Sequence, residues 1–157
     1  MPRNAQAIRV GQNLRGVIAA VKAELTLEIA ANLREACPVD TGHARANILP
    51  SVDQPFAGEV SDGSAYDAAV VAVIGAPPEA ELFVTNNVPY WPRLITGSSR
   101  QAPAGWDLAA VDAAVATVES RYAGLNIDVT ASEVVSDRGA GAATGLAAAY
   151  SPFGGDE

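Results

Sequence analysis

The sequence is poor in the residues from which most functional sites are built. Its 157 residues include one cysteine and one histidine, and aromatic residues make up only 6%. A single cysteine excludes an internal disulfide framework and fits a reducing compartment. A zinc site needs about four ligands, which this Cys and His cannot supply without carboxylates from elsewhere. We therefore expect neither a metal site nor a cofactor.

Basic residues are scarce as well. The sequence has ten Lys and Arg residues and eighteen Asp and Glu residues, which gives a formal net charge of -8. Nucleic-acid binding needs a basic surface, so this balance disfavours it, although DNA could still slide past an acidic surface without adhering. No apolar run approaches the roughly 20 residues of a membrane span, and the first residues lack the apolar segment of a signal peptide. We expect a soluble, cytosolic product with no membrane partner.

The chain is instead rich in small apolar residues. Hydrophobic residues make up 49% of the sequence, and much of this content is alanine. Alanine favours helix and close packing but contributes little core volume. The core should therefore be thin, and we expect the chain to bury further apolar surface against copies of itself.

A long amphipathic helix is predicted from about residue 6 to residue 36. At 1.5 Å per residue it would be roughly 45 Å long, so part of it should pack on something outside its own core. Gly11 and Gly16 weaken the first turns, so we expect the ordered helix to begin near Asn13. Pro38 should end it. The apolar residues that recur at steps of three or four are Leu14, Ile18, Val21, Leu25, Ile29, Leu33 and Ala36.

The middle of the chain predicts a small sheet and a short helix. Residues 45–55 are typical of an extended segment, and Pro50 restricts it to an edge or bulged strand because proline cannot donate to a ladder. A short helix is predicted from residue 64, where Ser64 can cap it, to residue 75. Residues 80–87 give the strongest strand pattern of the chain.

The last third predicts one more helix and a tail. Residues 87–105 hold three prolines and are expected to be irregular. Residues 106–124 predict a second amphipathic helix, with a stripe of Leu108, Val111, Val115, Val118 and Tyr122. The expected fold class is α+β: a long N-terminal helix, a small and mainly antiparallel sheet, a short middle helix and a second amphipathic helix packed on it. Residues 1–128 would form this single domain, and residues 129–157 would form a low-complexity tail that is mobile or docked on a partner. Residues 125–135 could add a short strand.

The only candidate for chemistry is the cluster of Cys37, Asp40 and His43. A Cys–His nucleophile pair is conceivable, but a thiol in the last turn of a helix has its pKa raised by the helix dipole. The structural alternative explains more, because Pro38 breaks the helix and the sequence from Asp40 to Gly42 has turn chemistry. We expect an elbow with no catalytic residue, in which Arg45 pairs with Asp40 or with the last helical carbonyls. A Cys-dependent enzyme and a regulatory binding module remain the alternatives.

Two segments carry a family resemblance. The first is "CPVDTGHARANIL", which matches the pattern P-V-D-T-G-x-x-R-x-N through Pro38, Val39, Asp40, Thr41, Gly42, Arg45 and Asn47. The second is "LFVTNNVPYWPRLITGSSRQAPAGW", which matches through Asn86, Asn87, Pro89, Tyr90, Leu94, Gly97, Ser99, Gln101, Ala102, Pro103, Ala104 and Gly105. Together they resemble a family of bacteriophage neck proteins, known as tail-completion, head–tail joining or minor tail components of long-tailed phages. The resemblance covers roughly residues 6 to 124, and His43 and Trp91 depart from the usual pattern.

The resemblance implies a structural virion protein without catalysis. Such proteins form a ring, here expected to be a hexamer, at the junction of head and tail. The implied partners are further copies of the chain, the head-side connector or stopper protein, and the tail terminator or tail-tube protein. Before assembly the protein would lie in the host cytoplasm. DNA would pass as a non-adhesive passenger, and the acidic residues expected to face the lumen are Asp53, Glu59 and Asp62.

Overall fold

The computed structural model describes the backbone of residues 3–122, 124, 130–135 and 142–147, with side chains for residues 14–122 and 124. Five helices and four strands are described. They are α1 (Arg3–Ala36), α2 (His43–Ala46), β1 (Leu49–Val52), α3 (Ala65–Ile74), β2 (Leu82–Asn86), α4 (Trp91–Ile95), α5 (Trp106–Arg121), β3 (Thr130–Val135) and β4 (Ala142–Ala147). The predicted α+β class is confirmed. No helix in these ranges is long and apolar enough to cross a bilayer.

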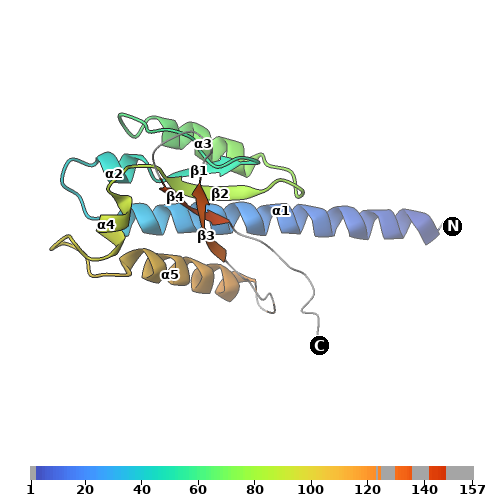
Figure 1. Cartoon of the computed structure of the whole chain (residues 1–157). Helices are drawn as coiled ribbons and strands as arrows, with labels where there is room; N and C mark the ends of the chain where they lie inside the picture. The colour runs from blue at the N-terminus through green and yellow to red at the C-terminus, as the bar shows by residue number, and fades with distance from the viewer. Residues whose placement is uncertain (1–2, 123, 125–129, 136–141, 148–157) are drawn as a thin grey trace.

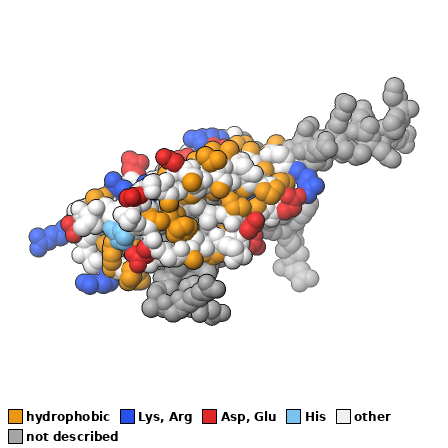
Figure 2. Space-filling model, turned by 90° about the horizontal axis from the view of Figure 1, so that it is seen from above, with side chains coloured by type: hydrophobic (Ala, Val, Ile, Leu, Met, Phe, Trp, Pro, Cys, Tyr) orange, Lys and Arg blue, Asp and Glu red, His pale blue; other side chains and the backbone are white. Residues whose placement is uncertain are grey.

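Helix α1 runs through the middle of the molecule. Helix α3 and the β1–β2 pair lie on one side of it, and α5 lies on the other (Figure 1). The N-terminal part of α1 extends past the other elements (Figure 1). Seen from the side of α3, hydrophobic side chains are spread over the surface (Figure 2). The molecule therefore has a central helix flanked on both sides, with apolar side chains exposed among polar ones on the side of α3.

The strands form one antiparallel sheet in the order β1-β2-β4-β3. Strand β1 lies at its edge, as Pro50 requires, and Pro50 is in register with Val84 of β2. The expected tail is corrected here, because β4 pairs with β2 and so belongs to the sheet. A ladder is made by backbone groups, so the small residues of β4 can join it although their composition resembles a linker. The predicted mobility of the remaining tail concerns residues outside the described ranges.

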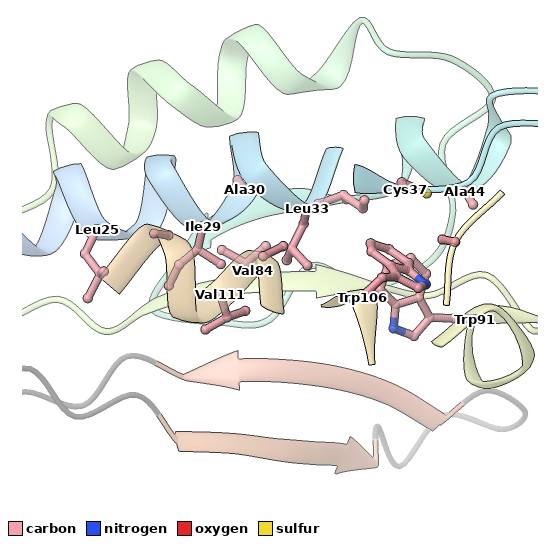
Figure 3. Close-up of a cluster of buried hydrophobic side chains, with 14 of the residues drawn as sticks. Leu25, Ile29, Ala30, Leu33, Cys37, Ala44, Val84, Trp91, Trp106 and Val111 are labelled. Carbon is pink, nitrogen blue, oxygen red and sulfur yellow. The ribbon is translucent and has the colours of Figure 1, made fainter. Parts of the chain in front are cut away.

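The core lies between α1, β2 and α5 (Figure 3). Ile29 and Leu33 of α1 face Val84 of β2, and the rings of Trp91 and Trp106 meet edge to face with centroids 5.4 Å apart. Few large side chains are needed, because alanines on α1 and α5 let the two helices approach closely. The buried alanines of these helices are Ala30, Ala110 and Ala114.

Three local predictions need correction. Helix α1 begins at Arg3 and not near Asn13, because a glycine weakens a helix without removing a backbone donor. Leu108 is 56% exposed, because Trp106 and the alanines of α5 make the buried stripe in its place. Two short helices, α2 and α4, occupy segments expected to be extended or irregular. The exposure of Leu108 reflects packing that no local pattern encodes.

Candidate functional site

The elbow between α1 and β1 has the predicted turn. Gly42 has a φ of 82°, in the left-handed region that favours glycine. Thr41 Oγ1 accepts a hydrogen bond from the backbone N–H of His43 at 3.3 Å. Arg45 Nη2 donates to the carbonyl oxygen of Cys37 at 3.4 Å, which is the second of the two predicted partners. Polar side chains thus tie the elbow to the end of α1.

Cys37 and His43 make their side-chain contacts with different partners. The Cys37 side chain is buried, and its Sγ lies 3.5 Å from the carbonyl oxygen of Pro38. Burial raises the pKa of the thiol, against the weaker opposing effect of Arg45 and Arg34. His43 Nε2 lies 2.8 Å from Glu59 Oε2. Burial and a raised pKa both favour the protonated thiol and disfavour its use as a nucleophile.

No group of three or more His, Cys, Asp or Glu side chains that could hold a metal ion occurs among residues 14–122 and 124. Glu59, from the loop between β1 and α3, contacts the elbow by pairing with His43. The cluster picked out in the sequence is therefore built from separate structural contacts.

The two signature segments meet at Gln101. The backbone N–H of Val39 donates to Gln101 Oε1 at 2.8 Å, and Gln101 Nε2 donates to the carbonyl oxygen of Val39 at 2.9 Å. The amide thus imitates the paired bonds of a neighbouring strand. Sixty-two residues separate the partners in sequence. The sequence singles out both residues but gives no sign that they pair.

Two asparagines of the signature, Asn47 and Asn87, brace the loop between β1 and α3, and a third, Asn86, holds α2. Asn47 Oδ1 accepts from the N–H of Val60 at 2.7 Å, while its Nδ2 donates to the Val60 carbonyl oxygen at 3.0 Å. Asn86 is buried and donates through Nδ2 to the carbonyl oxygen of Ala44 at 2.8 Å. Asn87 Nδ2 donates to the carbonyl oxygen of Gly58 at 2.8 Å. These amides replace backbone partners that irregular segments lack.

The turn before α5 depends on two glycines. Gly97 has a φ of 87°, and a Cβ built there would lie 2.8 Å from the backbone nitrogen of Ala104. Gly105 has a φ of 77° and donates to the carbonyl oxygen of Ile95 at 2.9 Å. Pro103 is exposed on this turn. Trp106 Nε1 closes the turn from the other side by donating to the carbonyl oxygen of Leu94 at 3.0 Å.

A groove of about 370 Å³ opens where the two segments meet. Tyr90 is 38% exposed, while Pro89 beside it is exposed to solvent. Burial raises the pKa of the Tyr90 phenol, and the charges of Cys37, Glu59 and Asp40 act in the same direction. The groove therefore combines apolar side chains, such as those of Tyr90 and Leu94, with the carboxylate of Asp40. Its lining residues are Pro38, Asp40, Thr41, Gly42, His43, Ala44, Tyr90 and Leu94.

The three acidic residues expected to face a lumen are all exposed, and each also has a local contact. Asp53 has a φ of 62°, and its Oδ1 accepts from the N–H of Glu81 at 3.2 Å. Asp62 Oδ1 accepts from the N–H of Ser64 at 2.8 Å, and hydrogen bonding to Ser64 lowers the pKa of that carboxyl group. Glu59 pairs with His43. Their orientation toward a channel remains a prediction.

Comparison with known proteins gives no match for the chain, whether among family models, curated proteins or solved structures.

Proposed function

We propose that this protein is a structural component of a phage neck. In this role it forms a ring, a hexamer in our proposal, that joins the DNA-filled head to the tail tube and lets DNA pass. The ring would contact a head-side connector or stopper protein on one side and a terminator or tail-tube protein on the other. The protein would act without catalysis.

The convergence of the two signature segments supports this proposal most directly. The pairing of Gln101 with Val39 means that both segments build one structural unit. In this unit the asparagine amides hold backbone groups, so the signature supplies rigidity and not reactive side chains. A shared pattern of this kind is expected of proteins selected for shape, since a ring subunit must present fixed surfaces to its neighbours.

Electron cryomicroscopy of particles that carry the protein would test the proposal. A ring of fixed copy number at the head–tail junction is the expected result. Deleting the gene should leave DNA-filled heads and free tails that fail to join. Normal tailed particles without the protein would overturn the proposal.

The groove favours a second candidate, a regulatory binding module. Its volume of about 370 Å³ suits one large side chain or a small ligand. The same particles distinguish the two candidates, because a regulatory module would be found in infected cells but not in purified virions. The Cys-dependent enzyme has no comparable support, since Cys37 is buried and its pKa is raised.

A further inference from the structure

The outer face of α3 is more apolar than an exposed helix face should be. The helix carries one charged residue, Asp67, and among its residues only Val73 is fully buried. Val71 and Ile74 are 70% and 66% exposed. A helix that is apolar nearly all round is normally covered on every side. Exposed apolar patches of this kind mark interaction surfaces.

A second unpartnered surface lies on the N-terminal part of α1. We call residues 3–17 the arm, and Figure 1 shows this end of α1 extending past the other elements. Leu14 and Val17 are 59% and 50% exposed and lie three residues apart, on one face of the helix. No side chain from residue 14 to residue 20 is buried. Most helical stability in proteins comes from packing, so the arm would gain stability from a partner that covers its apolar side chains.

The charges of the two surfaces are opposite. The arm contains Arg3, Arg9 and Arg15 and no acidic residue, and Arg15 pairs with Glu79 of its own subunit. Residues 63–82, which include α3, contain Asp67, Glu79 and Glu81 and no basic residue. Net charges of opposite sign attract the two surfaces and set their orientation.

The arm cannot fold back onto the face of its own α3 while α1 stays straight. Arg15 pairs with Glu79, and Lys22 Nζ donates to the carbonyl oxygen of Pro78 at 3.0 Å. These contacts fix the base of the arm beside the loop that follows α3. From there the helix continues outward, away from the domain (Figure 1). A second copy can reach the face that the arm's own subunit cannot cover.

We propose that the arm of one copy docks on the outer face of α3 in a second copy. Leu14 and Val17 would pack on Val71 and Ile74, and the basic arm would lie on the acidic segment around α3. Arm and face are different patches, so the contact is head-to-tail, and a pair of copies still has one free arm and one free face. Such contacts repeat from copy to copy and form a ring when the rotation between neighbours closes. The inference rests on the proposed function in that it names the contact that builds the ring.

Two complementary variants test this contact. The arm variant carries Leu14→Glu and Val17→Glu, and the face variant carries Val71→Glu and Ile74→Glu. All four side chains are exposed, so both variants should keep the circular dichroism spectrum and melting temperature of the parent. Light scattering should show an oligomer for the parent and a monomer for each variant. Leu108→Glu, at another exposed apolar side chain, is the matched control and should assemble as the parent does.

Mixing the two variants gives the sharpest result. The face variant keeps an intact arm, and the arm variant keeps an intact face, so an equal mixture should form a dimer and nothing larger. A contact between identical patches could not be restored in this way. A monomeric parent at high concentration, a variant that still assembles, or a mixture that stays monomeric would each overturn the proposal.

Engineered cysteines locate the contact. In a Cys37→Ala background, protein with Leu14→Cys mixed with protein with Val71→Cys should form a mixed disulfide when a mild oxidant is added. Disulfides only between two Leu14→Cys copies would mean that arms pair with arms, and the proposal would fail. If microscopy showed rings but no mixed disulfide formed, the proposed contact would be wrong while the proposed neck function would stand. If the mixed disulfide formed but the protein were absent from virions, the proposed neck function would be wrong while the proposed contact would stand.

Discussion

Gln101 holds the backbone of Val39 through both atoms of its side-chain amide, at 2.8 Å and 2.9 Å. The two residues belong to segments that lie 62 positions apart in the sequence. Because Val39 follows the end of α1 and Gln101 precedes α5, the pair fixes the two helices at the same end of the molecule. The groove lined by the elbow and Tyr90 depends on the same junction.

Gln101→Ala should destabilise the fold by about 2 kcal/mol, because each lost hydrogen bond contributes about 1 kcal/mol. Gln101→Glu should cost less, since a carboxylate still accepts from Val39 N–H but cannot donate to its carbonyl oxygen. Urea denaturation measures both differences. Gln54→Ala is the control at another exposed glutamine. Equal stability of all these variants would show that the bridge contributes nothing.

Gly42 and Gly97 should respond differently to substitution although both have positive φ. Nothing lies within 4 Å of a Cβ at Gly42, so Gly42→Asn should be tolerated and Gly42→Val should damage folding. At Gly97 a Cβ would lie 2.8 Å from the backbone nitrogen of Ala104, so Asn should be as harmful as Ala. Melting temperatures of the four variants check this. Rescue of Gly97 by Asn would mean that backbone strain, and not the close approach, sets the requirement.

Elements with strong local chemistry could be predicted from the sequence. Pro38 ends α1 and Pro50 confines β1 to the sheet edge, because both effects follow from the proline ring itself. The exposure of Leu108 could not be predicted, because it depends on which face of α5 packs against the rest of the domain. The place of β4 beside β2 could not be predicted either, for a different reason: ladder bonds join backbone groups and do not depend on side-chain type. In the site, the turn at Gly42 was predictable, whereas the bridge from Gln101 to Val39 is a long-range pairing.

The contacts of Glu24 with the end of α5 should make the free energy of unfolding depend on pH under acidic conditions. Hydrogen bonds from Tyr122 and Arg121 lower the pKa of the Glu24 carboxyl group below its ordinary value of 4.5. A carboxyl group with a depressed folded-state pKa contributes stability above its unfolded pKa and loses it as pH falls through the folded one. Glu24→Gln should therefore flatten the decline in stability below about pH 5. Glu28, whose Oε2 lies 3.8 Å from Arg121, supplies the matched Glu28→Gln control, which should change the profile less.

Cys37 and His43 should be dispensable for assembly. Cys37 is buried, so iodoacetamide should label it in the unfolded protein and not in the native one. Cys37→Ala and His43→Ala should assemble nearly as the parent does, measured by light scattering. If either variant stayed a folded monomer, the elbow would have a direct role in contacts between subunits.

The acidic residues of the loop between β1 and α3 should ease the passage of DNA. DNA is densely anionic, and a basic channel would hold it by releasing counterions. Changing Asp53, Glu59 and Asp62 together to Lys should therefore slow DNA ejection from assembled particles. The three residues also make local contacts, so a neutral set, Asp53→Asn, Glu59→Gln and Asp62→Asn, separates charge from structure. The neutral set should give a smaller delay.

Salt and position provide the controls for this prediction. Repulsion and attraction at a channel wall reach about 8 Å at physiological salt, so the delay should shrink as salt is added. Glu35→Lys with Asp112→Lys makes changes of the same sign at exposed sites on α1 and α5, and ejection should stay at the parental rate. Unchanged ejection in particles shown to contain the Lys triple variant would mean that this loop does not line the channel. If the variant with Glu35→Lys and Asp112→Lys delayed ejection equally, the delay would result from net charge and not from the position of the changed residues.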